Sequence, residues 1–198
     1  MLNQEVGSGL ADPVHDALAI FRAVLDALAH PGTLQPLPPG ADEVSALFRE
    51  LAAVLLALCD HDTSVWLSPS LNHQAASTFV GFHTGAPVTA DIQAAQFAFI
   101  AKGDALPELA LCNAGTQEYP DRSTTLVMHV EALSGGPRCI LRGPGIRDTQ
   151  TFAALGLPAN FTDLWAANHA LFPRGVDLIL VAHNQVLGLP RSTRIVEA

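Results

Sequence analysis

The most regular hydrophobic pattern of the sequence lies in residues 13–29 and predicts a helix. Asp12 is a suitable N-cap, Pro13 suits the first helical turn, and His30-Pro31-Gly32 ends the pattern. Apolar side chains recur between these limits at the spacing of one helix face. They are Val14, Ala17, Leu18, Phe21, Leu25 and Leu28.

A second helix is predicted over 44–58, after a stiff proline-rich connector at 36–40. Because alanine and leucine dominate its later half, we expect this helix to be buried on more than one side. Its apolar side chains share one face, and they are Val44, Leu47, Phe48, Leu51, Val54, Leu55 and Leu58.

The rest of the chain is predicted to be rich in strands. Apolar residues alternate with polar ones in 124–132, with Leu126 and Met128 facing one way and His129 the other, which is typical of a strand with one wet face. A turn at 134–137 then predicts a hairpin with 138–142. Short apolar runs predict further strands at 63–67, 96–101, 176–182 and 186–189.

Shorter helices are predicted at 70–82, 107–112 and 161–171. Helices therefore come mostly first and hairpins late, which indicates the α/β class with a mixed sheet flanked by helices. With 198 residues, of which 49% are hydrophobic, the chain is expected to form a single domain over 1–198.

Cysteine usage and hydropathy indicate a cytoplasmic protein. The three cysteines, Cys59, Cys112 and Cys139, are widely spaced in apolar contexts and are interpreted as buried, reduced thiols. No run approaches the ~20 apolar residues of a membrane span. Residues 1–9 lack the basic and apolar regions of a signal peptide.

Basic and acidic residues are distributed unevenly along the chain. The formal net charge of −9 and a single lysine, Lys102, argue against binding to nucleic acid or a membrane surface. The first 137 residues carry four basic and fifteen acidic residues, whereas the last 61 carry six arginines and four acids. An acidic protein that gathers its guanidinium groups in one region is expected to use them on anions or on an acidic partner.

The arginines of the C-terminal third are therefore the candidate partner-binding or anion-binding residues. Three interpretations remain open for them: a solvated edge that discourages aggregation, a protein-binding surface, and a site for a small phosphate-bearing ligand. The candidates are Arg138, Arg142, Arg174, Arg191 and Arg194.

The usual catalytic motifs are absent from the sequence. The histidines do not form the i, i+4 pair with glutamate of a zinc protease, and neither a Cys-x-x-Cys nor a G-x-S-x-G motif occurs. Residues 59–62 (Cys59-Asp60-His61-Asp62) and 143–145 are interpreted as turns. Lys102 is the single candidate for a Schiff-base lysine, but it follows an apolar strand at an expected solvent-facing end. We therefore predict no catalytic residue, no metal and no cofactor for this chain.

Seven short motifs nevertheless occur in order along residues 12–196, and together they resemble the PhnH family. This family is the H subunit of the bacterial carbon–phosphorus lyase system for phosphonate breakdown. The motifs are Phe21-Arg22 with His30-Pro31-Gly32, Asp60 to Ser68, Phe82 to Pro87, Leu133 to Gly136, Leu141 to Ile146, Phe172 to Leu180 and Leu189 to Thr193.

The resemblance implies a subunit of a soluble core complex with the family's G, I and J subunits. That complex displaces adenine from ATP with a phosphonate, which gives a ribose 1-phosphonate 5-triphosphate. It also implies a fold similar to pyridoxal-phosphate-dependent transferases, with the cofactor unused, and a structural or catalysis-supporting role without assigned catalytic residues.

We expect a homodimer when the chain is isolated, because helix 44–58 carries more apolar surface than one small domain easily covers, and the resembled family tends the same way. The alternative function is a free-standing enzyme or binding protein that acts on a phosphorylated small molecule through the arginine-rich C-terminal third.

Overall fold

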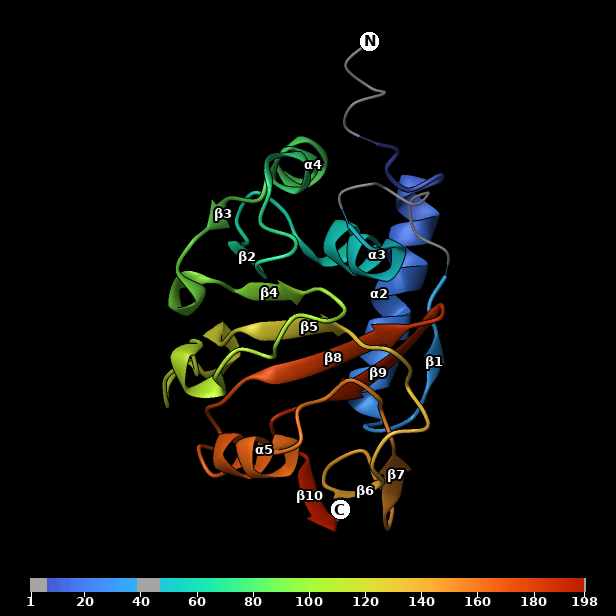
Figure 1. Ribbon diagram of the computed structural model, residues 1–198, viewed down its shortest axis with the longest axis vertical. Helices are drawn as coiled ribbons and strands as arrows, with labels where there is room; N and C mark the ends of the chain where they lie inside the picture. Colours follow the sequence, from blue (N-terminus) through green and yellow to red (C-terminus); the bar gives the residue numbers. More distant parts are fainter. Residues whose placement is uncertain (1–6, 39–46, 198) are drawn as a thin grey trace.

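The computed structural model describes residues 7–38 and 47–197, and within these ranges the chain forms a seven-stranded sheet and a separate three-stranded sheet (Figure 1). The strand order of the large sheet is β1-β9-β8-β5-β4-β2-β3. These strands span Gln35–Pro36 (β1), Gln185–Leu189 (β9), Asp177–Ala182 (β8), Thr125–His129 (β5), Phe97–Ile100 (β4), Val65–Leu67 (β2) and Val88–Thr89 (β3).

The large sheet is mixed, as the order of predicted elements indicated. Strands β3, β2, β4, β5 and β8 run parallel. Strand β9 joins antiparallel to β8, and β1 joins antiparallel to β9 at the same edge. The small sheet has the order β10-β6-β7, with β10 at Arg194–Glu197, β6 at Cys139–Arg142 and β7 at Gln150–Phe152. The α/β class is therefore confirmed.

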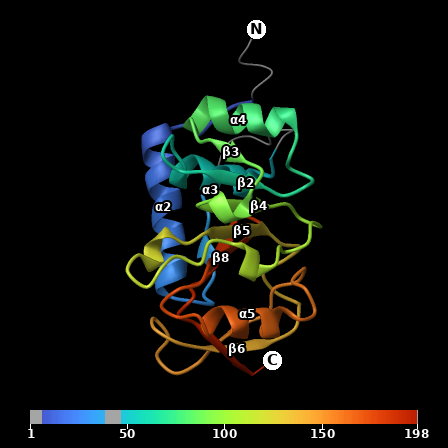
Figure 2. The ribbon, with the colours of Figure 1, turned by 90° about the vertical axis from the view of Figure 1, so that its left-hand side faces the viewer.

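Two hydrophobic cores lie on opposite faces of the large sheet. On one face, helices α2 (Pro13–Ala29), α3 (Arg49–Leu58) and α4 (Gln74–Thr84) pack over Phe99, Val127 and Ile179. On the other face, α5 (Phe161–His169) and the small sheet pack over Ile100, Met128 and Leu180. Figure 2 shows α5 and β6 at the opposite end of the molecule from α4. Successive residues of β4, β5 and β8 thus alternate between two buried faces.

The expected hairpin of 124–132 with 138–142 is wrong. Strand β5 is hydrogen-bonded in parallel to β4 on one edge and to β8 on the other, so it has no free edge for β6. Its second face is not wet either, because Val127 is fully buried under the helices. Strand β6 instead pairs with β7 and β10.

Helix α2 has the predicted limits, and the backbone N–H groups of Val14 and His15 donate to the Asp12 carboxylate at 3.2 and 3.1 Å. The buried face, however, is formed by Ile20, Ala23, Val24 and Ala27 and not by the large apolar stripe. A Cβ at Gly188 of β9 would lie 2.7 Å from the backbone C and O of Ala27. The helix therefore contacts the sheet through its small residues, because only small residues allow such a close approach.

Four large apolar residues of α2 are exposed on the opposite side. Val14 is 73% exposed, Leu18 45%, Phe21 45% and Leu25 53%. We refer to these four residues as the α2 stripe.

Helix α3 confirms the prediction of burial on more than one side, since Leu51, Ala52, Ala53, Val54 and Leu55 are all fully buried. Its predicted first residues, 44–46, lie outside the described residues. None of the helices in the described part of the chain combines the length and apolar character that a bilayer crossing requires.

Candidate functional site

A polar hollow lies where three parallel strands end, beside the first turn of α3. Lys102 follows β4, His129 is the last residue of β5, and His183 follows β8. Carboxyl ends of parallel strands share one edge of a sheet, which is where α/β proteins bind ligands. We call this site the carboxyl-edge hollow. It has a volume of about 390 Å³ and is lined by Phe48, Arg49, Glu50, Lys102, His129, Val130, Glu131, His183 and Asn184.

Glu50 connects three elements at the inner wall of the hollow. Its Oε1 accepts a hydrogen bond of 3.1 Å from the backbone N–H of Asn184, in the turn between β8 and β9. Its Oε2 lies 3.8 Å from Nε2 of His129, and the two side chains are only 13% and 12% exposed. The Phe48 ring packs on the imidazole with 4.5 Å between centroids. Glu50 and Phe48 thus both lie close to the imidazole at the end of β5.

The environment of His129 disfavours the charged form of its imidazole. Burial lowers the pKa of His129 below its ordinary value; the Glu50 carboxylate opposes this shift, and the nearby Lys102 and His183 side chains add to it. Its Nδ1 atom is buried and has no hydrogen-bond partner among the described residues. An unpaired buried nitrogen is costly, so this atom is open to a hydrogen bond from outside the described residues.

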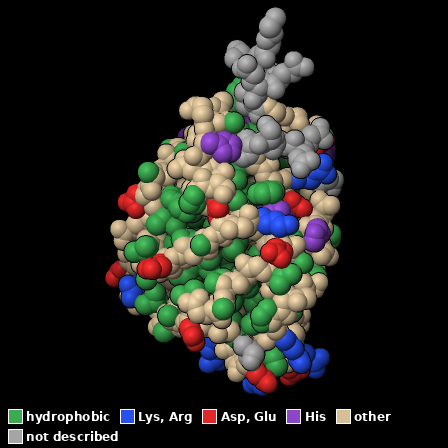
Figure 3. Space-filling model, viewed as in Figure 1, with side chains coloured by type: hydrophobic (Ala, Val, Ile, Leu, Met, Phe, Trp, Pro, Cys, Tyr) green, Lys and Arg blue, Asp and Glu red, His purple; other side chains and the backbone are tan. Residues whose placement is uncertain are grey.

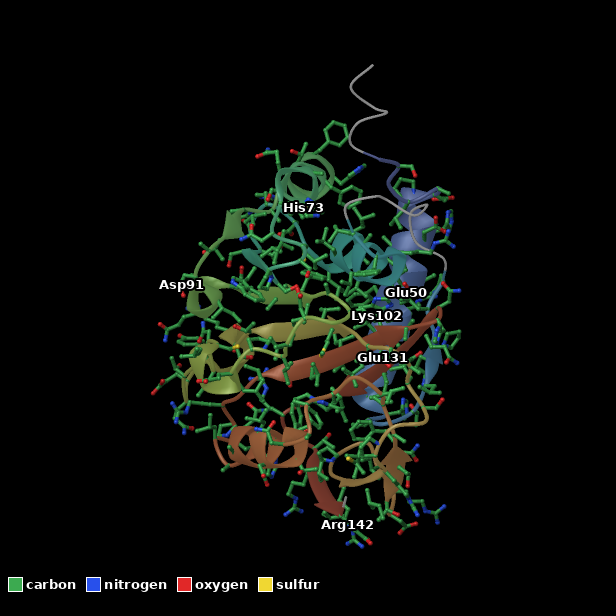
Figure 4. The ribbon with its side chains drawn as sticks, in the orientation of Figure 1. Glu50, His73, Asp91, Lys102, Glu131 and Arg142 are labelled. Carbon is green, nitrogen blue, oxygen red and sulfur yellow. The ribbon has the colours of Figure 1, made fainter. Side chains whose placement is uncertain are left out.

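The rim of the hollow carries charges of both signs. Figure 4 shows Glu50, Lys102 and Glu131 gathered at this end of the sheet, and Figure 3 shows basic, acidic and histidine side chains together right of centre. Within residues 7–38 and 47–197, no carboxylate oxygen lies within 4.0 Å of Lys102 or Arg49. Among the residues that the structure describes, both cations are therefore without an ion-pair partner.

The turn that closes the hollow has an unusual backbone. His183 and Asn184 have φ values of 52° and 56°, in the left-handed region that glycine adopts most easily. Two polar side chains stand there in place of glycine, and both line the hollow. Left-handed φ values at both central residues are typical of a two-residue hairpin turn, and this turn between β8 and β9 places two polar side chains at the site.

The described residues contain no cluster of three His, Cys, Asp or Glu side chains placed to hold a metal ion. Residues 59–62 form the predicted turn, in which the Asp62 backbone N–H donates to Asp60 Oδ1 at 2.9 Å. Burial raises the pKa of Cys59 to about 12, so this thiol remains protonated. All three cysteines are free and buried, as predicted.

The predicted arginine candidates lie apart from the hollow. Arg142 and Arg194 are exposed and directly opposite each other on β6 and β10, and Arg138 is exposed just before β6. Figure 4 places Arg142 at the far end of the molecule from Lys102, and Figure 3 shows basic side chains gathered at that end. The small sheet therefore carries a basic edge, formed by Arg138, Arg142 and Arg194.

The other two candidates differ from this basic edge. Arg191 is held by Asp177 and by the backbone carbonyl of Pro120. Arg174 is half-buried in the turn between α5 and β8, and its Nε atom has no partner in the described part of the chain.

Sequence reasoning did not identify Glu50, His129, Glu131 and His183 as one site. It also treated Lys102 only as a solvent-facing strand end, whereas Lys102 lines the same hollow as Glu50 and Glu131. A usable signal was present, because Lys102, His129 and His183 each stand at the end of an apolar strand run.

Comparisons with known proteins agree along most of the chain. The family model described as "Bacterial phosphonate metabolism protein (PhnH)" matches residues 8–196. A protein of Rhizobium meliloti (strain 1021), named alpha-D-ribose 1-methylphosphonate 5-triphosphate synthase subunit PhnH, is 50% identical over 193 residues, which cover 98% of this chain and 96% of the relative. A putative C-P lyase subunit protein, HtxG of Stutzerimonas stutzeri, is 33% identical over 177 residues, covering 88% and 83%.

Proposed function

The chain belongs to the PhnH family of bacterial phosphonate metabolism proteins, and we propose from this that it is a subunit of the complex that makes ribose 1-phosphonate 5-triphosphate. In that reaction a phosphonate oxygen bonds to C1′ of the ATP ribose, the bond from C1′ to adenine breaks, and adenine leaves. The observation that carries the proposal is the 50% identity to a named synthase subunit over 98% of this chain.

We further propose that the chain supports this reaction as part of a core complex with the G, I and J subunits of the carbon–phosphorus lyase system, in the cytoplasm. The basic edge of the small sheet supports such a docking role. Arg142 and Arg194 are direct cross-strand partners, and like charges in this position destabilise a sheet. An acidic surface on another subunit would relieve their repulsion.

The isolated chain is proposed to form a homodimer, but through a different helix from the one expected. Helix α3 buries its apolar residues within its own domain. The exposed α2 stripe is the better surface, because its positions 14, 18, 21 and 25 have the 4-3-4 spacing of a helix–helix seam. That spacing reads the same in both directions, so an antiparallel two-fold axis sets Val14 opposite Leu25 of a second copy and Leu18 opposite its Phe21.

The similarity to the pyridoxal-phosphate-dependent transferase fold also stays a proposal, and it is supported by the mixed sheet with helices on its faces. We propose that the cofactor is not used. Pyridoxal phosphate added to the chain should then give no Schiff-base absorbance that depends on Lys102.

The proposed function is tested by co-expressing a tagged I subunit with the G and J subunits, with and without this chain. We expect the chain to co-purify, and the complete complex to release adenine from ATP and methylphosphonate faster than the complex that lacks it. A chain that stays out of the complex, with adenine release unchanged, would contradict the proposal.

A further inference from the structure

We propose that the carboxyl-edge hollow is a binding site for a phosphorylated sugar, with Lys102 and Arg49 on the phosphoryl oxygens and Glu131 on the sugar hydroxyls. This inference rests on the proposed function only for its choice of ribose as the sugar. The position, the charges and the hydrogen-bonding capacity of the hollow carry the rest.

The position favours a small-molecule site. The hollow lies at the carboxyl ends of β4, β5 and β8, the edge of a parallel sheet where ligands bind. Its volume of about 390 Å³ falls within the range of small-molecule sites, roughly 300–1,000 Å³.

The cations of the hollow are suited to a phosphoryl group. Lys102 is exposed and Arg49 is half-buried, and no carboxylate of the described chain lies within 4.0 Å of either. Arg49 is also the first residue of α3, a helix of ten residues whose N-cap, Phe48, makes no side-chain capping bond. The positive end of the helix dipole therefore adds to the two side-chain charges.

The acids of the hollow restrict the ligand further. Glu50 is already engaged, since it accepts from the Asn184 backbone and faces His129. Glu131 is exposed and has no ion-pair partner in the described residues. A bare phosphate would meet repulsion from Glu131, whereas a sugar hydroxyl would donate to it, as ribose hydroxyls do to acidic residues in nucleotide-binding folds.

Titration calorimetry with the isolated chain tests the site, using ribose 5-phosphate as the probe and ribose and inorganic phosphate as its two halves. We expect binding of ribose 5-phosphate, with each half alone weaker by at least about tenfold. Lys102→Gln should raise Kd by about 10- to 100-fold, because it removes a charge-assisted hydrogen bond. Glu131→Gln should weaken the binding of ribose 5-phosphate but not the binding of inorganic phosphate.

Arg142→Gln is the matched control, since it removes a cation from the distant basic edge, and it should leave Kd unchanged. Lack of binding at millimolar ribose 5-phosphate would overturn the proposal. So would binding that Lys102→Gln leaves intact, and a loss confined to Arg142→Gln would place the anion site on the small sheet instead.

Failure of this inference is separable from failure of the proposed function. Lys102→Gln changes one exposed side chain, so the variant should melt like the wild type and still co-purify with the other subunits. If the chain assembles normally but does not bind the sugar phosphate, only the proposed ligand site is refuted. If the chain binds the sugar phosphate but does not assemble with the other subunits, only the proposed subunit role is refuted.

Discussion

Arg191 is held by Asp177 through both carboxylate oxygens. The backbone N–H and Nε of Arg191 donate to Oδ1 of Asp177 at 2.7 and 3.1 Å, and Nη2 donates to Oδ2. Asp177 begins β8, and Arg191 stands two residues beyond the end of β9, so the pair ties together the open ends of this hairpin. The Arg191 guanidinium, a candidate for partner or anion binding from sequence, therefore has a stabilising role within the chain.

Arg191→Ala is expected to destabilise the fold by about 2–4 kcal/mol, because it leaves a largely buried carboxylate without its partner. The side chains of Arg191 and Asp177 are 13% and 19% exposed, so solvent replaces the lost bonds only in part. Urea unfolding measures the change. Arg194→Ala, at an exposed position, is the control and should stay within about 0.5 kcal/mol of wild type. Equal stability of both variants would refute this role.

Gly188→Ala is expected to cost about 1–3 kcal/mol by pushing α2 off the sheet. The added Cβ would lie 2.7 Å from the C and O atoms of Ala27 and 2.8 Å from the backbone N of Leu28, and backbone cannot move aside as a side chain can. Gly81→Ala is the matched control, since it lies in α4 with nothing within 4 Å of its Cβ. There alanine should stabilise the helix by about 0.5–1 kcal/mol. Similar thermal melts for the two variants would contradict the close contact.

The stability of the chain should fall as the pH drops from 7 to 5, with a contribution from His129. Because burial lowers the pKa of His129 in the folded state, the unfolded chain binds a proton below pH ~6.5 that the folded chain does not. That contribution is lost as the pH falls through this window. His129→Phe should reduce the difference in unfolding free energy between the two pH values. Substitution of exposed His61 controls for the loss of an imidazole. If the unfolding free energy of His129→Phe depends on pH as it does in the wild type, His129 is not the group responsible.

The double substitution Arg142→Ala with Arg194→Ala tests the basic edge of the small sheet. If these arginines pair with acids of another subunit, the double substitution should weaken the binding free energy for that subunit by about 2–5 kcal/mol, as measured by co-purification and quantitative binding. A solvated edge would lose only about 0–1 kcal/mol. Arg174→Ala is a second probe, because its buried Nε lacks a partner in the described residues. Arg147→Ala, at an exposed position, is the matched control. If the double variant and Arg174→Ala both assemble like the wild type, the charge asymmetry has no docking role.

The sequence predicted the individual helices and strands better than it predicted which strands pair with each other. The apolar runs at 96–101 and 176–182 are central strands, because a strand buried on both faces must be apolar throughout. In 124–132 the alternation misled, since Thr125 and His129 lie at the two ends of β5 and only Val127 occupies the middle of its second face. Pairing of β5 with β8, across 52 residues from Thr125 to Asp177, has no local signal.

The same physical limit explains the site and the face of α2. Periodicity located the helix, but the large apolar residues marked one face, whereas the close approach to Gly188 is made by the backbone at Ala27 on another face. The carboxyl-edge hollow joins Glu50, Lys102 and His129 from three separate elements. Their common location depends on strand order, which local patterns do not determine.

The α2 stripe is predicted to form a homodimer interface that a single lysine substitution disrupts. Leu18 is 45% exposed in the single chain and central in the stripe, so an antiparallel pair of helices would bury it. Leu18→Lys should weaken dimerisation by at least about 100-fold, because an unpaired ammonium group is costly in an apolar interface. Ala19→Lys adds the same charge at the next exposed position, outside the stripe, and should leave the dimer intact.

Analytical ultracentrifugation over micromolar concentrations, with both variants and the wild type, distinguishes the outcomes. A dimer lost in Leu18→Lys and kept in Ala19→Lys places the interface on α2, since the substituted side chains are exposed in the chain itself and its fold should tolerate both. A monomeric wild type whose co-purification with other subunits requires Leu18 would assign the stripe to another subunit instead. A dimer that survives Leu18→Lys would show that the two-fold contact lies elsewhere, and the self-complementary spacing of the stripe would then have no role in pairing.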